Sequence, residues 1–323
     1  MLPWLRAERT RLNTVMAAGR LGHAPMILGS AGVGKRVFSG WLAARLLCLA
    51  PADGEPCGGC TACRLLPEGT HPDFFRLAPE DGKTEIRVDQ VRGFIDSVTL
   101  TPSIGNQRVG LIDPADRMNR NAANALLKTL EEPSGDVWLI LVTDRPDRLP
   151  VTVRSRCQVH RIGVPEREVA EDWLESRHPQ RNDKERSLAL TLADGAPLVA
   201  DGWLADGGLE VGLAIRDRLD ALVGGGTPDP TVPAEWHESP EATWTWLARW
   251  TEGWTRRLQT GSADGLGEAP PAGDPETLDR LDALWRDALA GRRMAGDPVR
   301  HDWLMTEWLR GWQQLAGRFP VAR

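Results

Sequence analysis

A glycine-rich segment, GSAGVGKR at Gly29–Arg36, constrains the fold of this chain more than any other feature of its sequence. The segment follows a short apolar run, Pro25–Leu28, and precedes apolar residues at helical spacing over Val37–Leu47. A strand, a glycine loop and a helix in that order form a phosphate-binding loop at the edge of a parallel sheet. We therefore expect an α/β domain built around this segment.

Two more buried strands are predicted, at Arg108–Asp113 and Val137–Thr143, with a helix over Asn121–Glu132 between them. This alternation predicts a parallel sheet covered by helices on both faces. After Ile162 the strand patterns stop, and helical periodicity predominates to the end of the sequence. The predicted helical segments there are Glu166–Ser176, Glu185–Gly195, Leu209–Val223, Glu241–Leu258, Pro275–Leu289 and Pro298–Phe319.

Composition limits the classes of function. The formal net charge is −6, so contact with DNA would need a local basic patch rather than bulk attraction. The N-terminal residues lack the apolar core of a signal peptide, and no run of about 18 apolar residues occurs. We therefore expect a cytoplasmic protein.

The chain has 14 tryptophans and no tyrosine. Trp246, Trp250 and Trp254 recur every four residues, as do Leu304, Trp308 and Trp312. Aromatic residues at this spacing line one face of a helix, which is more typical of packing than of base stacking. We expect these side chains to form core or an interface.

Four of the five cysteines form a cluster, with Cys48 followed by Cys57, Cys60 and Cys63 in a C-x8-C-x2-C-x2-C pattern. In a chain without an export signal, clustered cysteines indicate a metal site before disulfides. Four thiolates complete a tetrahedral zinc shell and leave no place for a water, so we predict a structural Zn²⁺ site. Unrelated thiols are the alternative. His71 is expected to be a turn residue rather than a further ligand.

The phosphate-binding loop lacks one chemical group. Gly29, Gly32, Gly34 and Lys35 suit an anion, but Arg36 stands where the pattern requires a hydroxyl ligand for Mg²⁺. Binding of ATP at this loop is therefore expected to be weak or absent, and the alternatives are a vestigial turn and a weak nucleotide site.

A second catalytic position is also altered. The strand ending at Asp113 resembles a Walker B strand, whose acid faces the metal and whose next residue is normally a Glu that activates water. Here the next residue is Pro114, which has no titratable group. Two missing groups argue against hydrolysis by this chain.

These motifs resemble those of the clamp-loader branch of the AAA+ ATPases, and the resemblance covers about the first 200 residues. It rests on the phosphate-binding loop, the four cysteines, HPDFF at 71–75, NAANALLKTLEEP at 121–133 and LPVTVRSRC at 149–157. The motor subunits of that family keep a Ser or Thr after the loop lysine and an Asp-Glu pair in Walker B. This chain has neither, and it has Gly195–Leu198 where those subunits place a sensor arginine. It therefore resembles a non-motor member.

The resemblance implies three domains. The first is an α/β AAA+ domain with a parallel sheet at 1–163, with a zinc module at 48–63 inside it. The second is a small three-helix lid at 164–208, and the third an all-α collar at 209–323 that joins a ring. Thr143 matches the sensor-one position of the family.

The resemblance also implies a function for the tripeptide Ser155-Arg156-Cys157, which matches the family's SRC motif. Arg156, with Ser155 beside it, would be an arginine finger that acts in trans on ATP held by a neighbouring gamma/tau subunit. Expected partners are gamma/tau and delta subunits, the beta sliding clamp and primer-template DNA. The chain would support loading of the clamp onto DNA without ATPase or polymerase activity of its own.

Two other functions remain open. One is an autonomous AAA+ NTPase with a divergent phosphate-binding loop, because Lys35, Asp113 and the glycines are present. The other is a zinc-stabilised protein that binds nucleic acid alone through the arginine-rich segment Arg145–Arg156, against which the net charge weighs.

Overall fold

The computed structural model describes residues 2–133, 136–223, 232–260 and 274–317. Its backbone divides into two compact units. The first comprises Met1–Pro179 with Ala193–Ala200, and the second comprises Gln180–Leu192 with Asp201–Arg323. The first unit contains a sheet, and in the second the described residues form helices joined by loops, without a strand.

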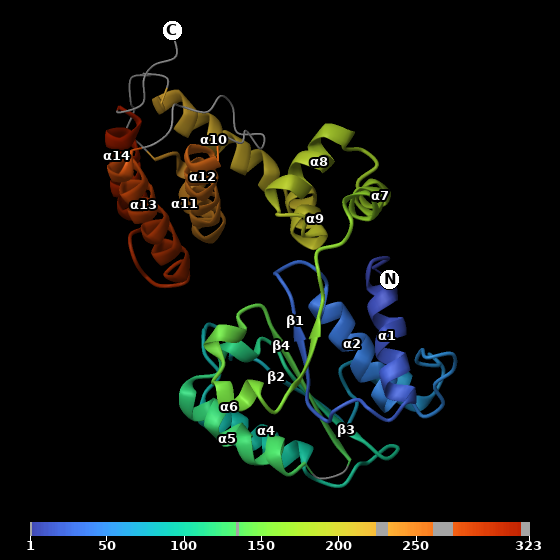
Figure 1. The fold of residues 1–323 in the computed structure, drawn as a ribbon. Coiled ribbons are helices and arrows are strands. Elements are labelled where there is room, and N and C mark those ends of the chain that lie inside the picture. Colours follow the sequence, from blue (N-terminus) through green and yellow to red (C-terminus); the bar gives the residue numbers. More distant parts are fainter. Residues whose placement is uncertain (1, 134–135, 224–231, 261–273, 318–323) are drawn as a thin grey trace. The chain divides into compact units, whose positions relative to one another are not determined.

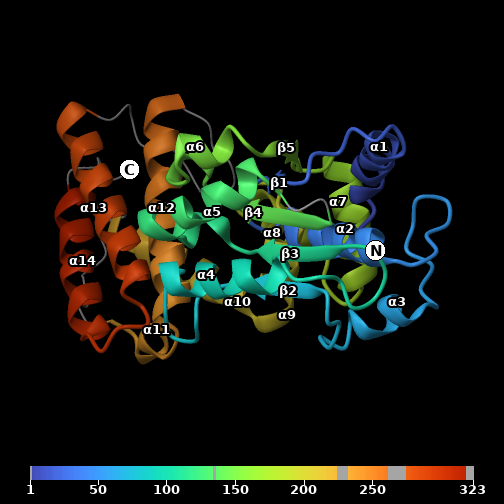
Figure 2. The ribbon, with the colours of Figure 1, turned by 90° about the horizontal axis from the view of Figure 1, so that it is seen from below.

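The sheet has five strands, and all neighbouring pairs run parallel in the order β2-β3-β4-β1-β5, which Figure 2 shows side by side. The strands are β1 Pro25–Leu28, β2 Phe74–Leu77, β3 Arg108–Ile112, β4 Val137–Thr143 and β5 Gln158–Arg161. The predictions of β1, β3 and β4 are confirmed. These are the central strands and are almost entirely buried, so their sequences are continuous apolar runs.

The two edge strands were missed by the sequence analysis. In β2 and β5 buried residues mix with partly exposed or exposed ones, including Arg76 and Arg161. An edge strand has a neighbour on one side only, so it needs fewer apolar residues and gives a weaker pattern. The predicted α/β fold with a parallel sheet is confirmed.

Helices cover the sheet of the first unit, with α1 and α2 on one side and α4 to α6 on the other (Figure 1). They are α1 Leu5–Ala17, α2 Lys35–Leu47, α3 Thr61–Leu65, α4 Val88–Val98, α5 Arg120–Glu131, α6 Val151–Arg154 and α7 Arg167–Arg177, with 3₁₀ turns η1 Ala115–Arg117 and η2 Pro146–Arg148. Beneath α4 and α5, Phe94 and Leu126 pack with Ile112, Leu139 and Leu141 of the sheet in one buried core. The predicted helices after the glycine loop and before Pro133 are confirmed as α2 and α5.

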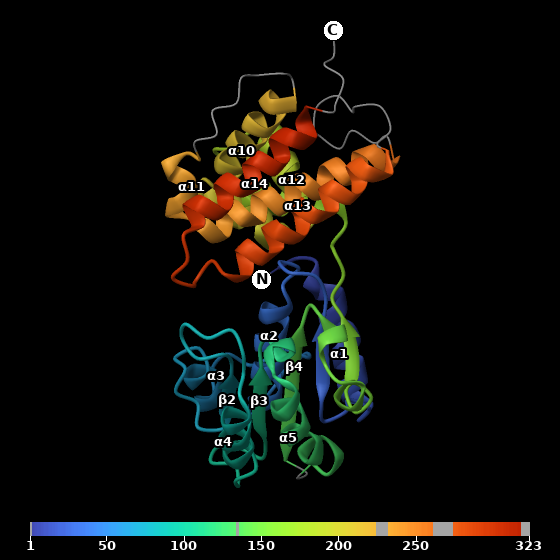
Figure 3. The same cartoon turned by 90° about the vertical axis from the view of Figure 1, so that its left-hand side faces the viewer.

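The second unit is a helical bundle in which α12, α13 and α14 lie side by side (Figure 3). Its helices are α8 Asp183–Leu192, α9 Pro197–Asp206 (which begins in the first unit), α10 Gly208–Val223, α11 Ala234–Glu238, α12 Pro240–Thr260, α13 Pro275–Arg293 and α14 His301–Ala316. The predicted segments correspond to α7, α8, α10, α12, α13 and α14, whereas α9 and α11 were not predicted as separate helices. The last segment starts at His301 rather than Pro298, and its predicted end at Phe319 lies outside the described residues.

The tryptophans of this bundle form its core. Trp246, Trp250, Trp254, Trp308 and Trp312 are each at most 4% exposed. The rings of Trp246 and Trp250 stack with centroids 5.5 Å apart, as do those of Trp308 and Trp312 at 5.8 Å. The indole N–H of Trp250 donates to a buried backbone carbonyl, as a buried indole requires. The prediction that these residues pack rather than stack on bases is confirmed.

The predicted domain limits at residues 163 and 208 stay predictions. The division into compact units places α7 in the first unit and α8 in the second. None of the helices in the described part of the chain is long and apolar enough to span a membrane.

Candidate phosphate-binding site

The glycine loop between β1 and α2 requires glycine at three positions. Gly32 and Gly34 have φ of +77° and +97°, in the left-handed region that side chains disfavour. A Cβ at Gly29 would lie 2.3 Å from the carbonyl oxygen of Ile162. The loop therefore has the backbone that a phosphate cradle needs.

Hydrogen bonds from distant residues hold this loop by its carbonyl groups. The backbone N–H of Leu198 donates to the carbonyl oxygen of Gly32 over 3.1 Å, and the indole of Trp4 donates to that of Val33 over 2.9 Å. The Nζ of Lys35 donates to the carbonyl of Ser30 over 2.7 Å. Within the described ranges no acceptor engages the backbone N–H groups of residues 32–37. Free N–H groups at the start of a helix form an anion-binding geometry.

A cavity of about 380 Å³ opens in front of the loop. Its charged walls include Lys35, Arg117 and Arg145 on the positive side and Asp144 on the negative side, with Leu198 as an apolar contact. Burial lowers the pKa of Lys35 below its ordinary value, while the neighbouring carboxylates, chiefly that of Asp144, act in the opposite direction. The cavity lining thus holds a lysine and three arginines, Arg36 among them, near the free backbone N–H groups.

Asp113 follows β3 directly and is only 3% exposed. Its Oδ2 atom lies 2.9 Å from Nε of Arg36 and 3.2 Å from Nη2 of Arg76. ATPases with a phosphate-binding loop hold Mg²⁺ with a hydroxyl of the loop and with an acid at the position of Asp113. In this chain the hydroxyl is missing and the acid is engaged. Position 36 offers a cation instead of an oxygen, and Asp113 is already paired with two guanidinium groups. The residues present do not fit Mg²⁺.

Thr143, expected at the sensor-one position, ends β4 and is fully buried. Its hydroxyl donates to Oδ1 of Asp116 over 2.7 Å and accepts from the backbone N–H of Arg145 over 3.0 Å. The structure thus places Thr143 in the lining of the cavity, but its hydroxyl already donates to Asp116.

Sequence reasoning missed Arg76, Asp116, Arg117, Asp144 and Arg145. Asp144 and Arg145 come directly after β4, and Asp116 and Arg117 follow β3 closely. Ligand-binding side chains of parallel α/β sheets gather at these strand ends, so the positions after a predicted strand were a usable signal. Arg76 had no signal, because it lies on a strand that was not predicted.

The four clustered cysteines come together as expected. The Sγ atoms of Cys48, Cys57, Cys60 and Cys63 all lie within 4.8 Å of one another, an arrangement that can hold a metal ion. Tetrahedral zinc with Zn–S bonds of about 2.3 Å would place its sulfurs about 3.8 Å apart, and the Cys57 and Cys63 sulfurs are 4.0 Å apart. Backbone N–H groups of the module, first that of Gly59, hold the pKa of the Cys57 thiol below its ordinary value.

A partly buried polar contact ties the loop of this cysteine module to two helices. Oε2 of Glu55 accepts from the indole of Trp41 on α2 over 2.7 Å and pairs with Arg9 on α1 over 3.5 Å. The Arg9 guanidinium also lies over the Trp41 ring, 4.9 Å from its centroid. The module is therefore fixed to the same helix that begins at the phosphate-binding loop.

Arg156 follows the short helix α6, and that helix lies beside α5 (Figure 1). Its Nη2 is 2.5 Å from Oε1 of Glu131, and its Nη1 donates to the carbonyl of Thr152 over 2.8 Å. The hydroxyl of Ser155 donates to the same carbonyl over 3.2 Å. The side chain of Arg156 is 34% exposed and does not line the cavity at the glycine loop.

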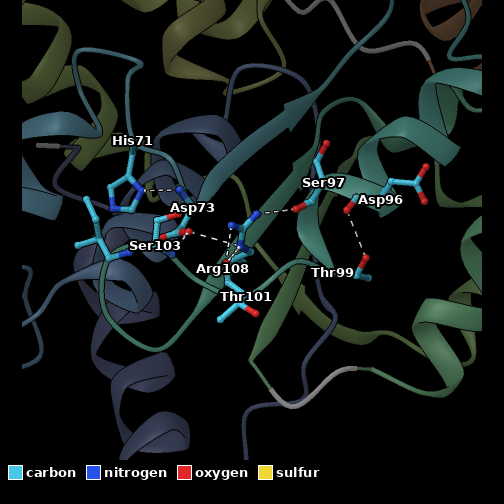
Figure 4. A network of polar contacts seen from close by, with 9 residues as sticks. His71, Asp73, Asp96, Ser97, Thr99, Thr101, Ser103 and Arg108 are labelled. Atoms are coloured by element: carbon cyan, nitrogen blue, oxygen red, sulfur yellow. Dashed lines mark hydrogen bonds and ion pairs between the residues drawn. The ribbon is translucent and has the colours of Figure 1, made fainter.

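The HPDFF segment builds a buried polar network rather than a surface site (Figure 4). Asp73 is fully buried and accepts from the backbone N–H groups of Ser103 and Ile104 over 2.7 and 2.6 Å. Its Oδ1 also lies 3.4 Å from Nε of Arg108, which donates to the carbonyls of Ser97 and Thr101. This network fixes the connection between α4 and β3.

The chain is similar to known proteins over most of its length. A family model described as "DNA polymerase III, delta subunit" matches residues 6–166. The DNA polymerase III subunit delta′ of Pseudomonas aeruginosa is 37% identical over 268 residues, which cover 83% of this chain and 81% of that protein. The subunit delta′ of Escherichia coli is 36% identical over 76% of this chain and 73% of its own length. The Escherichia coli subunit tau is 32% identical, over 66% of this chain and 35% of tau.

Proposed function

Because this chain belongs to the DNA polymerase III delta′ family, we propose that it is a non-hydrolysing, stator-like subunit of the bacterial sliding-clamp loader. One observation carries the proposal that it does not hydrolyse ATP. The acid that would hold Mg²⁺, Asp113, is paired with both Arg36 and Arg76, and Pro114 stands in place of the base. Without the metal and the base, phosphoryl transfer loses its main sources of charge stabilisation and water activation.

The contribution of the chain to ATP turnover is then made in trans. We propose that Arg156, supported by Ser155, reaches the ATP of an adjacent gamma/tau subunit and stabilises charge on the transferring phosphoryl group. Two observations support this role: Arg156 lies outside its own phosphate-binding cavity, and its guanidinium is partly exposed. To reach another subunit's nucleotide, Arg156 exchanges the carboxylate of Glu131 for a phosphate.

The proposed partners follow from this role. They are the gamma/tau and delta subunits, and within the assembled loader the beta clamp and primer-template DNA. The complex is expected in the cytoplasm, where replication takes place. The four cysteines, whose sulfurs lie within 4.8 Å of one another, are proposed to bind one structural Zn²⁺, because four thiolate ligands fill the zinc shell and leave no open coordination position.

The ATPase of the assembled loader tests this function. Arg156→Ala should slow ATP turnover by about a thousandfold at the one site that Arg156 serves. The assembled loader should then lose only part of its ATPase activity, because its other ATP sites continue to turn over. Arg148→Ala, an exposed arginine on the same connection between β4 and β5, should change nothing. The purified chain alone should show no ATPase activity. Turnover by the lone chain, or full activity with Arg156→Ala, contradicts the proposal.

The alternative of an autonomous AAA+ NTPase rests on Lys35 and Asp113. It requires Mg²⁺ to displace two guanidinium groups from Asp113, so hydrolysis by the lone chain that depends on Mg²⁺ would favour it over the proposal above.

A further inference from the structure

The cavity at the glycine loop has a charge balance unlike that of a metal-dependent nucleotide site. Its lining holds four cations, at Lys35, Arg36, Arg117 and Arg145. The lining carboxylates are three, at Asp113, Asp116 and Asp144. A further cation, Arg76, reaches Asp113.

Two of the three carboxylates are already engaged. Asp113 is paired with the guanidinium groups of Arg36 and Arg76, and Asp116 accepts the hydroxyl of Thr143. The hydroxyl of Thr143 leaves the charge of Asp116 in place, but five cations, Arg76 included, stand against three carboxylates. The net charge around the cavity is therefore positive, next to the free N–H groups that start α2. An excess of cations beside free N–H donors favours a multiply charged anion.

The guanidinium of Arg36 lies on the carboxylate that an ATP-hydrolysing relative uses for its metal. A divalent cation placed beside Arg36 would be repelled by its guanidinium. The negative charge of Asp113 could not compensate, because it is already balanced by Arg36 and Arg76. We infer that this cavity binds a small anion through its di- or triphosphate group and without a divalent metal. Arg36 takes the place of the metal, and Mg²⁺ weakens the binding. The inference is independent of the role of Arg156.

Arg36 suits this role because one nitrogen of its guanidinium is held by Asp113 while most of the side chain is open to solvent. Its Nε atom faces Asp113 at 2.9 Å, while its side chain is 69% exposed. The guanidinium carries further N–H donors beyond Nε, and a phosphate oxygen can accept from them. Lys35 supplies the second charge-assisted contact after its Nζ leaves the carbonyl of Ser30.

Calorimetric titration of the full chain tests this inference. The ligands are ATP, ADP and pyrophosphate, each in buffer freed of metal by resin and again with excess Mg²⁺. No chelator is added, so the cysteine cluster is undisturbed. We expect binding in the metal-free buffer and an affinity about tenfold lower with Mg²⁺, the effect of losing one charge-assisted contact. Pyrophosphate binding would show that the phosphate group suffices, whereas binding of the nucleotides alone would show that the nucleoside contributes.

Three variants locate the effect. Lys35→Ala should abolish binding, and Arg36→Thr should remove the inhibition by Mg²⁺, because it restores a hydroxyl ligand and releases one charge from Asp113. Arg92→Thr removes an exposed arginine on α4 and should behave as the original chain. Absence of binding in the metal-free buffer, or tighter binding with Mg²⁺, would overturn the inference. Neither result bears on the Arg156→Ala experiment, which uses the assembled loader.

Discussion

At the scale of single residues, the three loop glycines are required for two different reasons. Gly32 and Gly34 adopt left-handed backbone angles, whereas Gly29 has no space for a Cβ beside the carbonyl of Ile162. Gly40, further along α2, is exposed and has no atom within 4 Å of the place its Cβ would take. Two glycines of the same strand–loop–helix segment therefore differ in how they tolerate a methyl group.

The corresponding prediction compares two substitutions. Gly29→Ala should lower the free energy of unfolding by about 2 kcal/mol, because backbone atoms must move to admit the methyl group. Gly40→Ala should raise it by about 0.5–1 kcal/mol, since alanine favours the helix. Urea unfolding followed by circular dichroism measures both changes. Equal effects of the two substitutions would contradict the contact at Ile162.

Arg156 and Arg36 show at the same scale how one residue type serves two proposed purposes. Each guanidinium is paired with a carboxylate, Glu131 for the first and Asp113 for the second. Glu131 is about half exposed and Asp113 is buried. The Arg36 side chain is itself 69% exposed, so the two pairs differ in the acid: Asp113 is buried and has a second partner in Arg76, whereas Glu131 is open to solvent. An ion pair on a solvent-exposed acid contributes little and exchanges readily, which fits the proposed role of Arg156.

At the scale of elements, the cysteine module has little packing of its own to stabilise it. Its helix α3 has only five residues, and a single one of them, Ala62, is buried. A helix this short is not stable by itself. The contact of Glu55 with Trp41 and Arg9 anchors one side of the module, and the proposed zinc holds the other.

We therefore expect the purified chain to contain about one zinc per molecule. Cys60→Ser should lose this metal and lower the thermal midpoint, since removing a metal held at a thousandfold excess over its Kd costs about 4 kcal/mol. Cys157→Ser, which changes the fifth cysteine outside the cluster, should keep the full zinc content. Elemental analysis and thermal unfolding provide the measurements. Equal zinc content in the two variants would exclude the cluster as the site.

Two buried histidines, His71 just before β2 and His160 in β5, give the first unit a dependence on pH. His71 is 4% exposed, and its Nδ1 accepts from the backbone N–H of Asp73. Burial lowers the pKa of His71 below its ordinary value, and Asp73 opposes this only in part. Burial also lowers the pKa of His160 in β5, and the charge of Arg11 adds to this.

The unfolded chain thus takes up a proton at His71 before the folded chain does. Stability is complete above the ordinary pKa of about 6.5 and is lost as pH falls from there through the lower pKa of the folded state. His71→Asn keeps an acceptor for Asp73 and should weaken the dependence between about pH 7 and 5, with His160 accounting for the rest. Urea unfolding across this range checks it. An unchanged slope in the variant would show that His71 does not contribute.

At the scale of the whole molecule, the overall charge is acidic, with a formal net charge of −6. Binding of DNA depends on neutralising phosphates with lysine and arginine, and several arginines of the second unit are already paired with carboxylates on their own helices. The lone chain should therefore bind primer-template DNA only with micromolar or weaker affinity at physiological salt. Fluorescence anisotropy over a salt series measures this. Nanomolar binding by the lone chain would favour the nucleic-acid-binding alternative.

Local patterns were sufficient to predict the central strands, the glycine loop, the helices α2 and α5, and the cysteine set. Each of these follows from a short stretch of the sequence, the longest being the cysteine spacing over 48–63, either as an apolar period or as a fixed spacing of ligands. The helical second half and the packing role of its tryptophans could be predicted for the same reason.

Contacts between distant residues decided the rest. Arg36 indicated a missing metal ligand, but only the folded chain pairs it with Asp113 and adds Arg76 from an edge strand with a weak pattern. Likewise, the hydroxyl of Thr143 is committed to Asp116 by the alignment of two strand ends. A sequence pattern records which side chains are available, whereas the charge of a site depends on which of them the sheet brings within hydrogen-bonding distance.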